Sequence, residues 1–184
     1  AVRKKAKETW PKVAPLRELH KLLAHGGPFL GVYRESTIAR LEQKLPSILT
    51  QQGEAITKML FAYPDKALIA RRLAYYFSPT LVQGFVNLLA AQVAPFIAHY
   101  LVWVHTLQPT HHPTVLDAFT WKKYNEAYVL AYLLEERQGD AFDKKAFLRY
   151  LLGKLSENLA MDQGVLKEAM LTYALQAAAD EIAM

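Results

Sequence analysis

The chain has 184 residues, of which 52% are apolar and 21% are charged, and it contains no cysteine. This length is enough for one domain with its own core, and this composition excludes intrinsic disorder. The lack of cysteine excludes a disulfide scaffold, a thiolate metal site and a cysteine nucleophile.

The net charge of +5 is concentrated near the N-terminus. Residues 1–44 carry 10 Lys and Arg against 4 Asp and Glu, whereas residues 45–184 carry 12 against 13. We therefore predict a basic helical N-terminal extension over 1–44 and a helical domain over 45–184. Within the extension, Arg3, Lys4 and Lys5 are candidate contacts for phosphate or for an acidic partner surface; the alternative is a solvated helix or a linker.

Helical signals begin in the first quarter of the chain. Four leucines recur at the spacing of one helix face, and Gly26 and Gly27 supply a stop after them. The stretch "GGPFLGVYRE" then predicts a turn-rich connector, and Ser36 predicts the N-cap of a short helix that Pro46 limits or restarts. The apolar positions of these two helices are Leu16, Leu19, Leu22, Leu23, Ile38, Leu41 and Leu45.

Two later helix starts are predicted from capping chemistry. Asp65 and Ser78 each precede a helical pattern, and their side chains can accept hydrogen bonds from the free amides of the first turn. Pro79 at a first helical position loses nothing, because its missing N–H has no partner there. We therefore predict helices over "EAITKMLFAY" and "KALIARRLAYYF" and another beginning after Ser78.

The C-terminal half continues the helical pattern. "LQPTHHPT" predicts a loop, residues 115–137 a helix that Gly139 ends, and Asp143 and Asp162 the starts of two more helices. No segment shows sustained two-residue alternation bounded by turns. We predict an all-α protein, a helical bundle or irregular helical array of about seven to nine helices. Candidate core positions are Leu116, Phe119, Tyr124, Tyr128, Leu130, Leu134, Phe147, Leu148, Leu151, Leu152 and Leu155.

Residues 73–116 contain no Asp, Glu, Lys or Arg. The apolar part of this run exceeds the roughly 20 residues that a bilayer span needs. However, polar residues interrupt it, and the loop that follows has no Lys or Arg to anchor a topology. A helix that is apolar on all sides is also typical of a bundle centre. We therefore predict a buried hairpin or a kinked central helix broken at Pro95, rather than membrane insertion.

The residues that could carry chemistry form no recognisable set. His99 and His105 are six residues apart and point to different sides of a helix, and His111 and His112 are adjacent in a loop, whereas helical metal pairs need a spacing of three or four. No paired acid and base, phosphate-binding glycine loop or nucleophile motif occurs. We expect no catalytic residue, no metal site and no cofactor.

Two features suggest contact with partners. Arg71 and Arg72 could bind an acidic partner through bidentate hydrogen bonds, and the alternative is the charged face of an amphipathic helix. Tyr124, Tyr128 and Tyr132 are spaced by four and form one ridge on a helix. Tyrosine suits both core edges and protein interfaces, and the sequence leaves both open.

Two segments together resemble a known family. They are "LPSILTQQGEAITKMLFAYPDKALIARRLAYYFSPTLVQGFVNLL" and "FDKKAFLRYLLGKLSENLAMDQGVLKEAM". Their order resembles the tape measure proteins of contractile injection systems, with matching positions at 70–74, 78–81 and 142–148. The resemblance covers residues 45–175 and leaves out the basic N-terminal segment. Chains of that family are usually much longer.

The resemblance implies a structural role without an active site, so it assigns no catalytic residue. We expect a non-enzymatic structural or assembly protein that is cytoplasmic during assembly and then part of a secreted or intracellular particle. Its partners would be other proteins or further copies of itself, ahead of nucleic acid. The alternative is a helical adaptor that recognises an acidic protein segment or nucleic acid through Arg71, Arg72 and the "RKKAK" arm.

Overall fold

The computed structural model describes residues 14–26, 31–106, 117–135 and 142–159, together with Gly164 and Glu168. These described residues form eight α-helices and one short 3-10 turn, without any strand, which confirms the predicted all-α array. The elements are α1 (Ala14–His25), α2 (Gly31–Gln51), α3 (Gly53–Ala62), α4 (Lys66–Tyr76), α5 (Pro79–Ala90), η1 (Ala91–Val93), α6 (Ala94–Thr106), α7 (Ala118–Glu135) and α8 (Lys144–Leu159).

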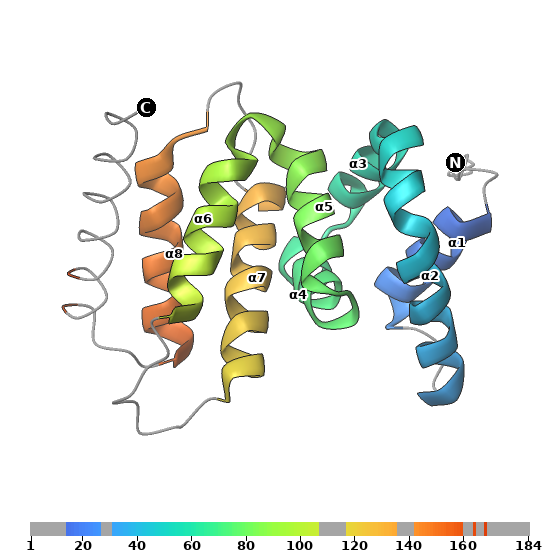
Figure 1. The fold of residues 1–184 in the computed structure, drawn as a ribbon, viewed down its shortest axis with the longest axis horizontal. Coiled ribbons are helices and arrows are strands. Elements are labelled where there is room, and N and C mark those ends of the chain that lie inside the picture. Colours follow the sequence, from blue (N-terminus) through green and yellow to red (C-terminus); the bar gives the residue numbers. More distant parts are fainter. Residues whose placement is uncertain are drawn as a thin grey trace, which may run out of the picture.

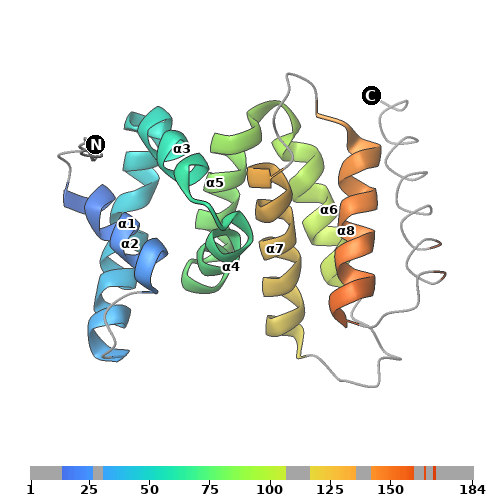
Figure 2. The same cartoon turned by 180° about the vertical axis from the view of Figure 1, so that it is seen from behind.

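The described helices are arranged side by side in an elongated array (Figure 1). α7 lies in the middle and packs against α4, α5, α6 and α8, and its contact with α4 is the most extensive between the described helices. α1 and α2 lie together at one side of the array, and α8 lies at the other. α5 lies in front of α4 in Figure 1, and the reverse view in Figure 2 brings α4 to the front.

The central helix is α7, which is buried on almost every side. Its buried residues include Lys123, Asn125 and Glu126 as well as apolar side chains. Trp121 is buried too, and its indole Nε1 donates a 2.8 Å hydrogen bond to the Val104 carbonyl of α6. Phe119 differs from the prediction: it was expected in the core but is 61% exposed, because it lies in the first turn of α7, next to Ala118 and Asp117, which are also exposed.

Residues 79–106 of the uncharged run fold as α5, η1 and α6, a hairpin beside α7 rather than the central helix. The helical path breaks at Ala90, whose φ is −151° and ψ 51°, five residues before the proline that was expected to mark the break. Pro95 instead lies in the first turn of α6. A proline ring clashes with the carbonyl four residues earlier, which explains why the irregular backbone precedes it.

By length and composition alone, one stretch of the described residues, Pro79–His105, could cross a membrane. In the structure this stretch consists of two helices in contact with each other, and just under half of its most apolar window is buried. Core helices of soluble proteins have the same properties. Whether the stretch meets a membrane therefore stays a prediction.

The N-terminal helices belong to the same core as the rest. All four leucines predicted for α1 are buried, and Gly26 follows the helix with a φ of +74°, the left-handed conformation that suits a glycine stop. Side chains from the α3–α4 region bind carbonyls at the end of α1: Tyr63 donates to His20, Arg72 to Leu23 and Tyr76 to Gly26. The boundary predicted between residues 44 and 45 lies inside α2.

In α2, the predicted cap at Ser36 and the predicted break at Pro46 are both wrong. α2 begins at Gly31, so Ser36 lies inside the helix instead of capping it, and the end of the predicted connector is helical. Pro46 neither ends nor restarts α2, which continues to Gln51. Packing of the buried Leu41, Leu45 and Ile48 against the core outweighs the local cost of the proline.

Three predicted caps are confirmed. The side chains of Asp65 and Ser78 accept hydrogen bonds from the backbone N–H groups of Leu68 and Leu81, at 2.8 and 3.3 Å. Asp143 accepts from the N–H of Lys145 at 2.8 Å. The predicted loop at 107–114, the stop at Gly139 and the last helix from Asp162 lie outside the described residues, apart from Gly164 and Glu168.

Candidate protein-interaction surfaces

A cluster of tyrosines with one arginine lies across α4 and α7. The Tyr75 and Tyr124 rings meet edge to face with centroids 6.5 Å apart, and the Tyr124 and Tyr128 rings stack at 6.0 Å. Tyr75 is 39% exposed, and both α7 tyrosines are half-buried. We call Arg71, Tyr75, Tyr124 and Tyr128 the tyrosine surface.

The register of α4 against α7 creates this surface. The carbonyl of Phe77 lies opposite Lys123, Tyr75 lies opposite Tyr124, and the charge of Arg71 acts on Tyr128. Residue numbers therefore fall along α4 as they rise along α7, so the two helices are antiparallel.

Two phenol groups of the tyrosine surface, those of Tyr75 and Tyr128, are held protonated. Burial raises the pKa of Tyr128 to about 12, the neighbouring Tyr124 and Tyr75 add to this rise, and Arg71 opposes it. Burial also raises the pKa of Tyr75, with Tyr124 adding to the rise. At neutral pH these hydroxyls therefore remain neutral hydrogen-bonding groups beside a cationic guanidinium.

The two adjacent arginines have different surroundings. Arg71 is exposed and lies beside the tyrosines, whereas Arg72 is half-buried and donates to the Leu23 carbonyl at the end of α1. The structure therefore separates the predicted pair: Arg72 holds α1, and Arg71 faces solvent. Arg3, Lys4 and Lys5, the other predicted contacts, lie outside the described residues.

The predicted tyrosine ridge is divided between surface and core. Tyr124 and Tyr128 belong to the tyrosine surface, but Tyr132 is buried among the rings of α8 and the residue before its cap. Its ring centroid lies 5.2 Å from that of Phe147 and 5.8 Å from that of Phe142. The core interpretation is therefore confirmed for Tyr132, whereas contact of Tyr124 and Tyr128 with a partner stays a prediction.

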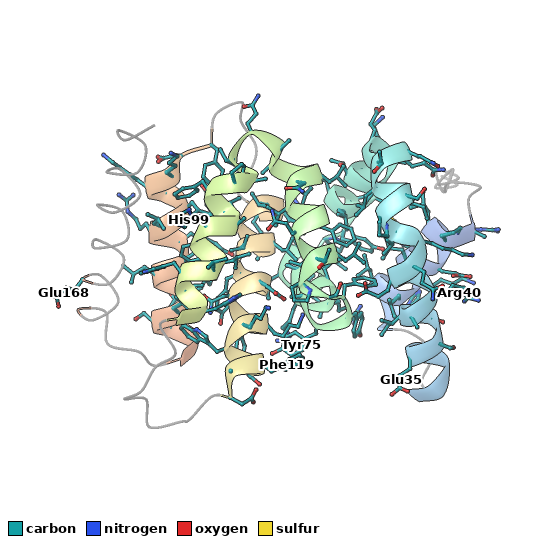
Figure 3. All side chains as sticks on the ribbon, in the orientation of Figure 1. Glu35, Arg40, Tyr75, His99, Phe119 and Glu168 are labelled. Atoms are coloured by element: carbon teal, nitrogen blue, oxygen red, sulfur yellow. The ribbon has the colours of Figure 1, made fainter. Side chains whose placement is uncertain are left out.

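A second surface is defined by the absence of charge. The exposed residues of α5, η1 and α6 include no Asp, Glu, Lys or Arg, since the whole run from 73 to 116 lacks them. Val102 stands out because 67% of its surface is exposed, the largest fraction among the large apolar side chains of the described residues. We call this surface the charge-free face; its exposed residues are Pro79, Thr80, Asn87, Ala91, Gln92, Pro95, His99 and Val102 (Figure 3 labels His99).

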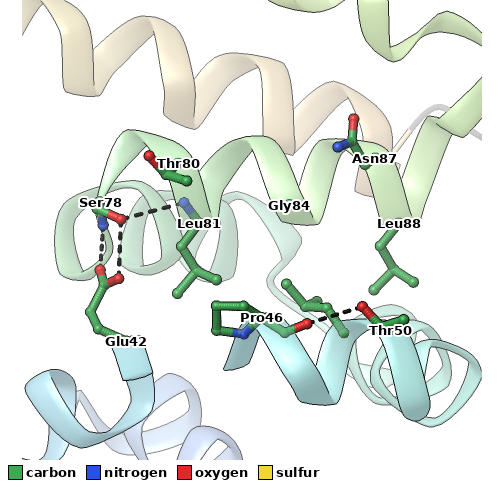
Figure 4. A pocket seen from close by; sticks show the side chains of 10 residues that line it. Glu42, Pro46, Thr50, Ser78, Thr80, Leu81, Gly84, Asn87 and Leu88 are labelled. Carbon is green, nitrogen blue, oxygen red and sulfur yellow. Dashed lines mark hydrogen bonds between the residues drawn. The ribbon is translucent and has the colours of Figure 1, made fainter. Parts of the chain in front are cut away.

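An open groove of about 480 Å³ lies between α5 and α2 (Figure 4). Its floor is apolar, with Leu49, Leu81 and Leu88, and Gly84 allows the helices to approach: a Cβ there would lie 3.0 Å from Leu49 Cδ1. At one end, Glu42 accepts hydrogen bonds from the backbone N–H and the hydroxyl of Ser78. Glu42 therefore joins α2 to the start of α5.

The most deeply buried charges lie inside α7. Lys123 Nζ lies 2.9 Å from Glu126 Oε2 and donates to the Phe77 carbonyl, also at 2.9 Å. The two side chains are only 5% and 2% exposed. Burial raises the pKa of Glu126, against the opposing effect of the hydrogen bond from Lys123. Because both charges are paired and enclosed, this pair fits a structural role that joins α7 to the end of α4.

The described histidines are not gathered into a metal site, and the described residues contain no group of three His, Asp or Glu side chains able to hold a metal ion. His99 is exposed, and His105 lies half-buried at the end of α6. Burial and the charge of Lys122 lower the pKa of His105 to about 4. His111 and His112 lie outside the described residues.

His105 should make stability depend on pH. Its pKa is about 4 when folded and 6.5 without that environment, so the unfolded chain binds more protons between these values. This contribution is fully present above pH 6.5 and is lost as the pH falls towards 4. We expect the urea midpoint of the native protein to fall across this range, and to fall less in His105→Gln. His99→Gln, at an exposed position, is the control; an equal fall in His105→Gln would contradict the prediction.

Sequence reasoning identified Arg71 and the tyrosines of α7 but missed Tyr75 as their partner. Tyr75 and Tyr124 are 49 positions apart in the sequence, so only the α4–α7 register joins them. Comparisons of the chain with protein-family models, curated proteins and solved structures find no significant match.

Proposed function

We propose that this chain is a non-enzymatic structural or assembly protein whose copies associate through the charge-free face. The observation that carries the proposal is the lack of any charged residue on the exposed surface of α5, η1 and α6, in a chain of which 21% is charged. The fully buried centres of protein interfaces are depleted of charged residues in the same way. The resemblance to tape measure components of contractile injection systems supports this role.

A second copy is the partner that this surface suits best. The net charge of +5 is concentrated in residues 1–44, so contact between the N-terminal segments of two copies would bring like charges together. The charge-free face avoids this repulsion and leaves no ion to be desolvated. Val102, at 67% exposure, offers apolar area to bury there. Assembly would take place in the cytoplasm, before the protein becomes part of a secreted or intracellular particle.

The test is the mass of the native protein in solution. We expect a defined oligomer by size-exclusion chromatography with light scattering, with a mass that low and high salt leave unchanged, because the contact contains no charge. A protein that stays monomeric at every concentration would contradict the proposal. Partition into lipid vesicles in place of self-association would indicate a membrane surface.

Val102→Asp should weaken the self-association by about tenfold or more, because burying an unpaired carboxylate costs well over 1.4 kcal/mol. The matched control is Ala67→Asp, which adds the same charge at an exposed position of α4. Sedimentation velocity over a concentration series measures both. Equal dissociation constants for the two variants would exclude the charge-free face as the contact.

A second function is an adaptor that recognises an acidic protein segment or nucleic acid. The observation that favours it is Arg71, which is exposed and forms no ion pair with a described carboxylate. Binding of polyglutamate or DNA by such an adaptor should weaken steeply as salt rises. Salt-independent binding, or none, would contradict this function.

A further inference from the structure

We propose that the tyrosine surface binds a protein segment that carries a carboxylate between apolar side chains, with Arg71 holding the carboxylate and the three tyrosines holding the apolar groups. This inference rests on the adaptor function above and names its site and its ligand. It uses α4 and α7, whereas the proposed self-association uses α5 and α6, so the two can be tested separately.

The guanidinium of Arg71 lacks a carboxylate partner among the described residues. Their ion pairs are Arg40–Glu18, Lys58–Glu54 and Lys123–Glu126. The carboxylates near the two ends of the same side of α7 are otherwise occupied: Asp117 accepts from Thr120, and Glu135 accepts from the Tyr150 hydroxyl at 3.0 Å. A planar guanidinium presents two parallel N–H groups that fit a carboxylate.

The rings beside Arg71 are already held in place. Edge-to-face packing fixes Tyr75 against Tyr124, and stacking fixes Tyr124 against Tyr128. Little side-chain entropy is therefore lost when a ligand covers them. Tyrosine and arginine are also the residues most enriched among those that dominate binding energy at protein interfaces. Figure 3 shows Tyr75 at the surface of the molecule.

The dimensions of the site limit the ligand to a short segment. Leu68, Arg71 and Tyr75 lie on one side of α4 over two helical turns, which span about 10 Å at a rise of 1.5 Å per residue. Leu68 is half-buried and extends the apolar area beyond Arg71. The cation thus lies between apolar groups on both sides, and the complementary segment has its carboxylate in the middle.

Charge distinguishes this ligand from the other candidates. A nucleic acid brings many phosphates, whereas the tyrosine surface has one cation, and the charge of Asp117 acts on Tyr75 at its edge. A second copy meeting about a two-fold axis at this site would place the two Arg71 side chains near each other. A single carboxylate from another protein segment pairs with Arg71 and brings neither additional negative charges nor a second arginine.

The experiment uses three short fluorescent peptides that differ only at a central residue, Glu, Gln or Lys, between leucines. Binding to the full chain is measured by fluorescence anisotropy. We expect the Glu peptide to bind about tenfold more tightly than the Gln peptide, as a charge-assisted pair predicts. Arg71→Gln should remove this preference, and Arg71→Glu should reverse it in favour of the Lys peptide. Tyr75→Ala should weaken all three peptides.

The controls separate this site from the rest of the molecule. Arg149→Glu changes an exposed arginine on α8 and should leave all affinities unchanged. Glu-peptide binding that survives Arg71→Glu but is lost on replacing Arg3, Lys4 and Lys5 by Gln would overturn the site and leave the adaptor function standing. Equal binding of the Glu and Gln peptides, or a stronger Arg71-dependent affinity for a single-stranded oligonucleotide, would overturn the proposed ligand. If neither the peptides nor polyglutamate nor DNA bind, the adaptor function fails too.

Discussion

Lys123→Met should destabilise the protein by about 3–5 kcal/mol, the typical cost of removing one partner of a buried ion pair. The substitution leaves the Glu126 carboxylate 2% exposed without its counter-charge and removes the hydrogen bond to the Phe77 carbonyl. The double variant Lys123→Met, Glu126→Leu removes both charges and should recover most of this loss. Urea unfolding followed by circular dichroism measures all three proteins.

Acid provides an internal control for that result. Burial already raises the pKa of Glu126, and loss of Lys123 removes an opposing effect, so the pKa rises further in Lys123→Met. A raised folded pKa gives stability that is present at low pH and lost as the pH increases through it. Mild acidification should therefore reduce the difference in the free energy of unfolding between Lys123→Met and the double variant. A loss below about 1 kcal/mol in Lys123→Met would show that the pair is dispensable.

Pro46→Ala should stabilise the protein by about 1–3 kcal/mol. Pro46 lies in the interior of α2, where it has no N–H to donate to the Glu42 carbonyl, and its exposed ring contributes little burial. Alanine restores the hydrogen bond, and the greater freedom of the unfolded chain offsets part of the gain.

Pro79→Ala is the matched comparison for Pro46→Ala. Pro79 occupies the first turn of α5, where the missing N–H has no intrahelical partner and the Ser78 cap remains in place. We expect no gain in its urea midpoint. Similar shifts in the two variants would mean that the position of the proline within the helix does not control its cost.

The sequence predicted best what depends on neighbouring residues. The caps at Asp65, Ser78 and Asp143 rest on a side chain and an amide two or three positions apart, and all three form. Pro46 shows the limit of such reasoning, because the buried Leu45 before it and Ile48 after it keep α2 continuous. The proline does disfavour a helix locally, and tertiary packing outweighs this local effect.

The order of burial among the helices could not be predicted from apolar content. α5 and α6 contain no charged residue, yet α7 is the enclosed helix and carries Lys123, Asn125 and Glu126 inside. Polar side chains usually mark a solvated face, and here an ion pair and a hydrogen bond from Asn125 to the Trp121 carbonyl allow their burial. The tyrosine surface could not be predicted from the sequence either, because only the packing of α4 on α7 brings its residues together.

The central place of α7 has a consequence for synthesis. A chain leaves the ribosome from its N-terminus, so α4, α5 and α6 emerge before the helix against which they pack. Until residues 118–135 follow, side chains such as Leu73, Phe85 and Ile97, all fully buried in the finished fold, lack part of their enclosure. We therefore expect the core around α4, α5 and α6 to close only after α7 has emerged.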